Sequence, residues 1–116
     1  MKLNEFINVE FNYLSKYNED EINAYLDYRD SEEFEIDWLQ NSAELNECEL
    51  TEDEVSELEA LREFIFEQVF NFTSNGDLSA YISDDFELIG INLFLKKGNV
   101  YAENLLNFYK RNKLPK

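Results

Sequence analysis

The 116-residue chain has no histidine, one cysteine, one proline and three glycines. Without histidine, the commonest general base and metal ligand is missing, and the usual serine–histidine and cysteine–histidine catalytic groups are excluded. Cys48 cannot form a disulfide within the chain or a Cys-x-x-Cys metal site, and the glycines do not form a phosphate-binding loop. A pair of carboxylates remains conceivable for glycoside hydrolysis, but with 26 acidic residues no pair is distinguished. We therefore predict a protein that is not an enzyme and needs no cofactor or metal.

Long apolar runs are also missing. No stretch approaches the roughly 20 apolar residues that span a bilayer, and the opening residues MKLNEFINVEFNYL do not have the pattern of a secretory signal. The sequence predicts a cytoplasmic protein without a membrane segment.

Positive charge is scarce and unevenly placed. Ten Lys and Arg oppose 26 Asp and Glu, which gives a formal net charge of −16. Residues 1–66 hold 20 acids and four bases, whereas residues 67–116 hold six of each. An acidic half of this kind repels nucleic acid and anionic lipid and attracts basic surfaces. We expect a protein partner with a basic surface, and neither nucleic acid nor membrane.

The fold predicted from the remaining residues is all-α, a single domain over 1–116 with about five to six helices that end in an antiparallel hairpin. A hydrophobic fraction of 44% with 16% aromatics is too high for a disordered chain. Thr51 and Glu54 form a capping-box pattern, and apolar residues then recur every three or four positions, which predicts a helix over 52–73. Residues 74–77 have the composition of a turn.

Two further helices are predicted after that turn. Ser83 is placed as a helix start, with Asp84 and Asp85 in the first turn, where the helix dipole favours anions. The Lys96–Gly98 segment is typical of its end, and Asn99 is expected to cap a last helix that ends before Pro115. The short connection between them predicts the antiparallel hairpin.

The first third of the chain is more ambiguous. Helical spacing of Phe6, Val9 and Tyr13 favours a helix from about residue 3 to 16, and residues 18–21 look like a second helix start. The segment SEEFEIDWLQ, residues 31–40, alternates apolar and acidic residues as a strand does, but its i, i+4, i+5 spacing favours a short helix capped by Ser31.

Residues 71–82 place a glycine at the sixth position of a possible calcium loop. The first position is Asn71 rather than Asp, and the twelfth is Ile82 rather than the bidentate Glu that such loops need. A plain turn is the preferred interpretation.

Acidic and aromatic residues are interleaved around Trp38 with almost no base. Aromatic anchors carry much of the energy of protein interfaces, while surrounding charges speed encounter and select partners. A solvated acidic surface and a core position for Trp38 are the competing interpretations. The candidate partner-binding residues are Tyr25, Asp27, Tyr28, Asp30, Glu32, Glu33, Glu35, Asp37 and Trp38.

Residues 81–115, YISDDFELIGINLFLKKGNVYAENLLNFYKRNKLP, resemble the C-terminal helical hairpin of small acidic bacterial immunity proteins. These are the antidotes paired with contact-dependent inhibition and related polymorphic toxins. The shared features are the helix start at Ser83–Ile89, a short turn, and an aromatic helix that runs into a basic Leu-Pro end. The resemblance implies a cytoplasmic protein without catalysis that covers the active site of a toxin, and it transfers no individual functional residue.

The leading hypothesis is therefore an immunity protein that forms a 1:1 complex with a basic toxin, in particular a nuclease, and occludes its active site. An acidic nucleic-acid mimic, such as a phage inhibitor of restriction or CRISPR nucleases, is the alternative. A mimic should carry regularly spaced carboxylates in place of phosphates, and the neutral second half of the chain argues against that. A carboxylate-pair hydrolase and an adaptor without inhibitory activity are the remaining classes.

Overall fold

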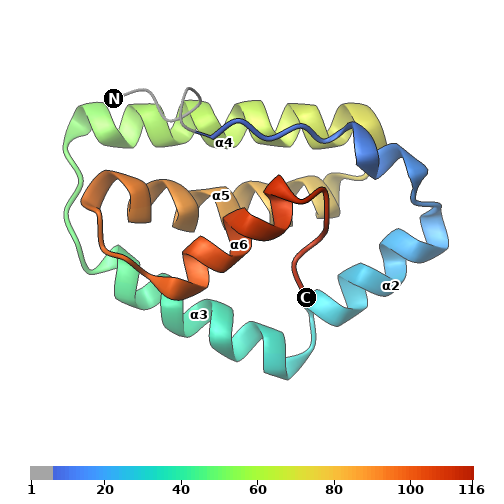
Figure 1. Ribbon diagram of the computed structural model, residues 1–116, viewed down its shortest axis with the longest axis horizontal. Helices are drawn as coiled ribbons and strands as arrows, with labels where there is room; N and C mark the ends of the chain where they lie inside the picture. The colour runs from blue at the N-terminus through green and yellow to red at the C-terminus, as the bar shows by residue number, and fades with distance from the viewer. Residues whose placement is uncertain (1–6) are drawn as a thin grey trace.

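The computed structural model describes residues 7–116 and shows a helical protein with no strand in that range (Figure 1). A 3₁₀ helix, η1 (Asn12–Lys16), is followed by five α-helices. Their bounds are α2 (Glu19–Arg29), α3 (Glu32–Asn46), α4 (Glu52–Thr73), α5 (Gly76–Leu95) and α6 (Val100–Lys110). The predicted all-α class is confirmed.

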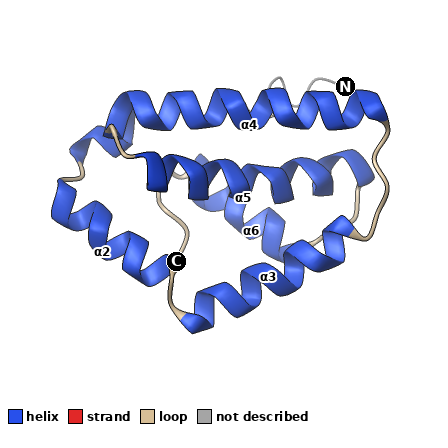
Figure 2. Ribbon diagram, turned by 180° about the vertical axis from the view of Figure 1, so that it is seen from behind, coloured by secondary structure: helices blue, strands red, loops and turns tan. Residues whose placement is uncertain are grey.

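Helix α5 lies at the centre of the molecule. It runs beside α4 on one side and α3 on the other, while α6 crosses one of its faces (Figures 1 and 2). Its buried side includes Leu78, Ile82, Phe86 and Ile89, which are at most 1% exposed. Every other helix therefore packs directly or indirectly on α5, and a polar residue on its buried side must be satisfied by its neighbours.

Three predicted helices are confirmed with their caps: the one that starts near residues 18–21, the one capped by Ser31, and the one over 52–73. Asn18 and Thr51 each form a capping box with the glutamate three residues later, and the Ser31 side chain accepts from the Phe34 amide. Residues 32–40 are helical rather than extended, because Phe34 and Trp38 lie one turn apart on the inward side while the acids remain in solvent.

The predicted start of a helix at Ser83 is wrong. Helix α5 already begins at Gly76, where the Asn75 side chain accepts from the Leu78 amide at 2.8 Å. The Leu78–Ile82–Phe86 spacing continues the buried stripe back to this cap, so Ser83, Asp84 and Asp85 lie within the helix. Because residues 76–82 are helical, the segment cannot form a calcium loop.

The end of the chain follows the prediction more closely. Helix α5 ends at Leu95, Lys96 takes the left-handed cap position and Gly98 has a φ of +63°. Asn99 caps α6 by accepting from the Ala102 amide. Helix α6 then returns across α5, and the last residues run down to α2 (Figure 1).

The predicted helix over 3–16 is wrong for residues 7–11 and is met only by a 3₁₀ segment after them. Residues 7–11 form no helix, and only Asn12–Lys16 are helical, in one short 3₁₀ segment. Residues 3–6 lie outside the described range. Ile7, Phe11 and Leu14 are buried, and η1 packs on α4. None of the helices formed by residues 7–116 has an apolar stretch long enough to cross a membrane.

Candidate acidic interface and its supporting network

Asp85 is an acidic residue on the buried side of α5, and its side chain is fully buried. It accepts two hydrogen bonds from Arg29 on α2, at 2.7 and 3.0 Å, and one from the Trp38 indole nitrogen on α3 at 2.9 Å. The Tyr109 hydroxyl on α6 donates to it as well. One carboxylate on α5 is therefore bonded to three other helices.

The protonation states in this network follow from burial and charge. Burial is the largest influence on the pKa of Arg29 and would lower it, but Asp85, Tyr109 and Tyr25 together raise it above its ordinary value, so the guanidinium stays charged at neutral pH. Burial, followed by the charge of Asp85, raises the pKa of Tyr109 well above its ordinary value. The phenol therefore keeps the proton that it donates to the carboxylate.

Tyr25 extends the network to the end of the chain. Its hydroxyl donates to the Pro115 carbonyl oxygen at 2.7 Å and accepts from Arg29 at 3.3 Å. Tyr25 is 5% exposed, and burial raises the pKa of its phenol. This contact joins the last residues of the chain to α2.

The structure places the nine candidate partner-binding residues at the corner between α2 and α3, in two environments. Six carboxylates are exposed there: Asp27, Asp30, Glu32, Glu33, Glu35 and Asp37. Tyr28 is 38% exposed, Trp38 is half-buried and Tyr25 is buried. Trp38 thus holds the α2–α3 corner against α5 and Tyr25 holds it against the C-terminal segment, while the carboxylates and Tyr28 face outward.

Two apolar residues that sequence reasoning did not select also lie on this surface. Ile36 is 55% exposed and Leu39 is 53% exposed, both on α3. Their signal in the sequence is relative position: when Phe34 and Trp38 occupy the inward side of the helix, Ile36 points to the opposite side and Leu39 more than about 90° away from the inward side. Together with the six carboxylates and Tyr28, they form what we call the acidic face.

A hollow of about 190 Å³ opens on the acidic face beside α5. Its lining combines three carboxylates, three aromatic rings, one leucine and one guanidinium: Asp30, Glu35, Asp84, Phe34, Trp38, Tyr81, Leu39 and Arg29. The Tyr81 hydroxyl donates to Asp30 across the hollow. Asp84 is paired with Arg62 of α4, which also contacts Glu87 at 3.2 Å.

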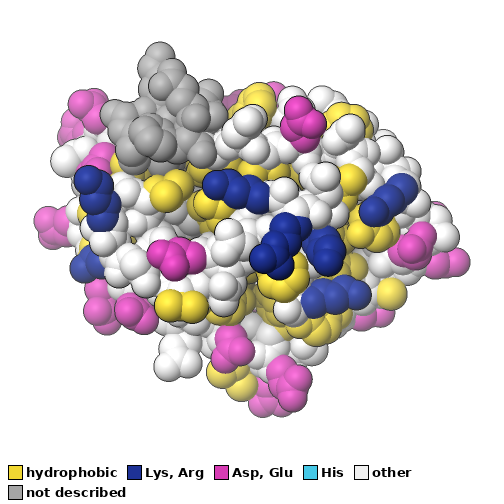
Figure 3. All heavy atoms as spheres, viewed as in Figure 1, with side chains coloured by type: hydrophobic (Ala, Val, Ile, Leu, Met, Phe, Trp, Pro, Cys, Tyr) yellow, Lys and Arg dark blue, Asp and Glu magenta, His cyan; other side chains and the backbone are white. Residues whose placement is uncertain are grey.

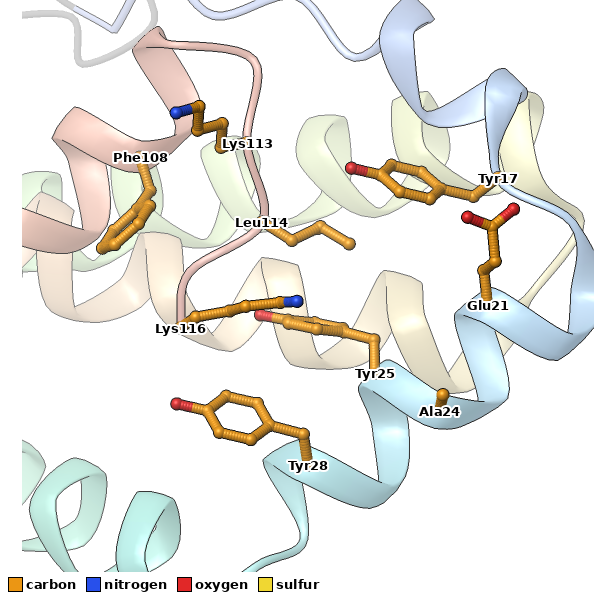
Figure 4. A pocket seen from close by; sticks show the side chains of 9 residues that line it. All are labelled: Tyr17, Glu21, Ala24, Tyr25, Tyr28, Phe108, Lys113, Leu114 and Lys116. Carbon is orange, nitrogen blue, oxygen red and sulfur yellow. The ribbon is translucent and has the colours of Figure 1, made fainter.

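A larger hollow of about 570 Å³ lies between α2 and the C-terminal segment (Figure 4). Tyr17, Tyr25 and Tyr28 line it from one side, and Lys113 and Lys116 belong to the other side, where the Lys116 side chain points toward Tyr25. Because its lining contains Glu21 together with these two lysines, the hollow has mixed charge and lacks the acidic excess of the neighbouring surface.

Basic side chains gather over α6 and the C-terminal segment on the side shown in Figure 3. Lys110, Arg111, Lys113 and Lys116 are all exposed. Among the described residues, the ion pairs within 4 Å involve only Arg29 and Arg62. The basic C-terminal region therefore does not neutralise the carboxylates of the acidic face through direct pairs.

A second group of exposed rings lies on α4. Phe66 and Phe70 are stacked, with ring centroids 6.3 Å apart, and they are 37% and 44% exposed. Glu63 and Glu67 are exposed on the same helix. In the part of the chain that the structure describes, no three Cys, Asp or Glu side chains are arranged to hold a metal ion.

Comparison with known proteins places this helical, acidic chain in a family. No curated protein matches it. The family model described as Immunity protein PIM1 covers residues 2–116, nearly the whole chain. The chain therefore belongs to the Immunity protein PIM1 family, and its function is the neutralisation of a toxin by binding.

Proposed function

We propose that this protein acts in the bacterial cytoplasm as a non-catalytic inhibitor of a toxin nuclease, and that it covers the basic active site in a 1:1 complex. The toxin would belong to a contact-dependent inhibition or related polymorphic system. The proposed contact surface is the acidic face at the α2–α3 corner. The observation that carries this proposal is the uncompensated charge of this face: it exposes six carboxylates, while nearby Arg29 is buried and paired with Asp85.

The composition of the acidic face fits such a partner in two ways. A nuclease must present cationic groups to hold phosphates, and complementary charge speeds encounter with that surface. Exposed Tyr28, Ile36 and Leu39 add apolar area, which supplies binding energy once water is excluded. In this proposal Tyr25 and Trp38 support the acidic face from inside the protein, because their bonds to Pro115 and Asp85 fix the shape of the α2–α3 corner.

Charge reversal tests the assignment of the face. The toxin is first identified by capture with the purified protein and mass spectrometry, and confirmed by inhibition of nuclease activity in vitro. The double variant Glu35→Lys/Asp37→Lys is expected to weaken inhibition at least 100-fold, because two attractive contacts become repulsive. The measurement is the inhibition constant at fixed salt.

The matched control is Glu63→Lys/Glu67→Lys, which makes the same change in net charge on the exposed side of α4. It should weaken inhibition less than tenfold. Thermal unfolding of both variants shows whether either change disrupts the fold. If the α4 reversal is the more damaging, the interface lies on α4 and the assignment to α2–α3 is wrong.

A further inference from the structure

The hollow on the acidic face has the size of a socket for one side chain. Its volume of about 190 Å³ is below the roughly 300–1,000 Å³ of pockets that hold drug-sized ligands. Helices α2 and α3 form one wall through Asp30, Phe34 and Trp38, and α5 forms the other through Tyr81 and Asp84. The walls are fixed by bonds that cross the gap, from Tyr81 to Asp30 and from Trp38 to Asp85.

The electrostatics of the hollow favour a cation. Asp30, Glu35 and Asp84 line it, while its lining guanidinium, Arg29, is held bidentately by Asp85 behind the wall. Arg62 reaches Asp84 from α4 but divides its charge with Glu87. Burial raises the pKa of Asp84 although Arg62 lowers it, so the ion pair does not fully offset desolvation of this carboxylate.

The aromatic lining selects a planar cation. Arg29 already demonstrates the preferred packing, because its guanidinium carbon lies 4.4 Å from the centroid of Phe34 and 5.3 Å from that of Tyr81. A guanidinium stacks on rings and bonds carboxylates in a fork, whereas an ammonium is a compact, strongly hydrated charge. The indole of Trp38 offers a further ring in the same hollow.

We propose that this hollow receives one arginine side chain of the toxin, bonded by the carboxylates of Asp30 and Glu35 and stacked against Trp38. The inference rests on the proposed use of the acidic face, and it adds a defined anchor to a contact otherwise driven by diffuse charge. It also brings α5 into the interface through Tyr81 and Asp84, two residues outside the set selected from the sequence.

A small probe tests the hollow without the toxin. Ethylguanidinium is titrated into the ¹⁵N-labelled protein at constant ionic strength, and amide and indole shifts are followed by NMR. The single tryptophan gives one indole N–H signal, and this signal should shift saturably together with amides of Asp30, Tyr81 and Asp84. Butylammonium should produce shifts at least threefold smaller. Shifts no larger than those caused by NaCl, or spread evenly over the protein, would overturn the proposal.

Variants localise the probe response and connect it to the toxin. Glu35→Gln should reduce ethylguanidinium affinity at least fivefold, while Glu44→Gln, nine residues later on α3, should leave it unchanged. With the toxin, a double-mutant cycle between Glu35→Gln and alanine variants of its exposed arginines should show coupling of at least tenfold for one arginine.

The two proposals fail in different ways. If the Glu35/Asp37 reversal abolishes inhibition but no toxin arginine couples to Glu35 and the probe does not bind, the acidic face stands and the arginine socket is wrong. If the reversal leaves inhibition intact, the proposed face itself is wrong, whatever the small probe does.

Discussion

Asp85 shows how a single residue can define the packing of a small helical protein. Its carboxylate is bonded by Arg29, Trp38 and Tyr109, which come from three different helices. Buried ion pairs contribute little net stability relative to apolar replacements, but removal of one partner leaves the other charged and unsatisfied. The network therefore enforces one arrangement of α2, α3 and α6 around α5.

Asp85→Ala should lower the free energy of unfolding by about 3–5 kcal/mol, because buried Arg29 loses its counter-charge. Asp84→Ala, at the next position, should cost only about 1 kcal/mol, since its pair with Arg62 is more than a third exposed. Urea unfolding followed by fluorescence of Trp38 measures both. The double variant Arg29→Met/Asp85→Leu should recover much of the loss, because it removes both charges together. Equal costs for the Asp84 and Asp85 variants would contradict this account.

At the scale of elements, the junction between α4 and α5 sets where the central helix begins. Ser74 adopts a left-handed conformation at the end of α4, and Asn75 immediately caps α5. This tight connection folds α5 back along α4, so that Leu78 and Ile82 meet the stripe of Leu61, Ile65 and Val69. A later start at Ser83 would leave Leu78 and Ile82 outside the helix and remove them from this contact.

Asn75→Ala should lower the free energy of unfolding by about 1 kcal/mol, because the Leu78 amide loses its side-chain acceptor. Asn71→Ala is the control, since Asn71 is exposed within α4 and alanine is the better helix former. It should be neutral or slightly stabilising. The midpoint of urea unfolding, measured for both variants, distinguishes them, and a neutral Asn75 variant would show that the cap is dispensable.

At the scale of the whole molecule, the charge distribution is the dominant property. The formal net charge of −16 arises from residues 1–66, while the basic residues near the C-terminus lie over α6 and the last segment (Figure 3). Such a separation orients an approaching basic partner from a distance comparable to the Debye length, which is about 8 Å at physiological salt. This charge separation affects the rate of association, whereas the close contacts of the acidic face affect the rate of dissociation.

The association rate constant with the toxin should therefore fall at least tenfold between about 20 and 500 mM NaCl. The dissociation rate should change much less, and stopped-flow and surface-binding kinetics measure the two rates separately. The variant Glu32→Gln/Glu33→Gln/Glu35→Gln/Asp37→Asn should flatten the salt dependence of association. An association rate independent of salt would mean that the charge has no part in recognition.

The sequence by itself determined most of the local structure. Asn18, Ser31, Thr51 and Asn99 each identify a helix start, because a side-chain acceptor satisfies first-turn amides regardless of what packs around it. The apolar stripe of α4 and the acidic excess before residue 60 are equally readable. The structure of the N-terminal segment could not be predicted from the sequence in this way, because residues 7–11 bury Ile7 and Phe11 without forming a helix.

Only the tertiary structure decided the roles of the polar and aromatic residues. Asp84 and Asp85 are identical and adjacent in sequence, yet one pairs with Arg62 at the surface and the other holds Arg29 in the core, because successive helix positions point about 100° apart. Tyr25 and Tyr28 differ in the same way, one bonded to Pro115 and one exposed. Helical periodicity shows which residues share a side of a helix, but only the packing of α2, α3 and α6 around α5 determines which side is covered.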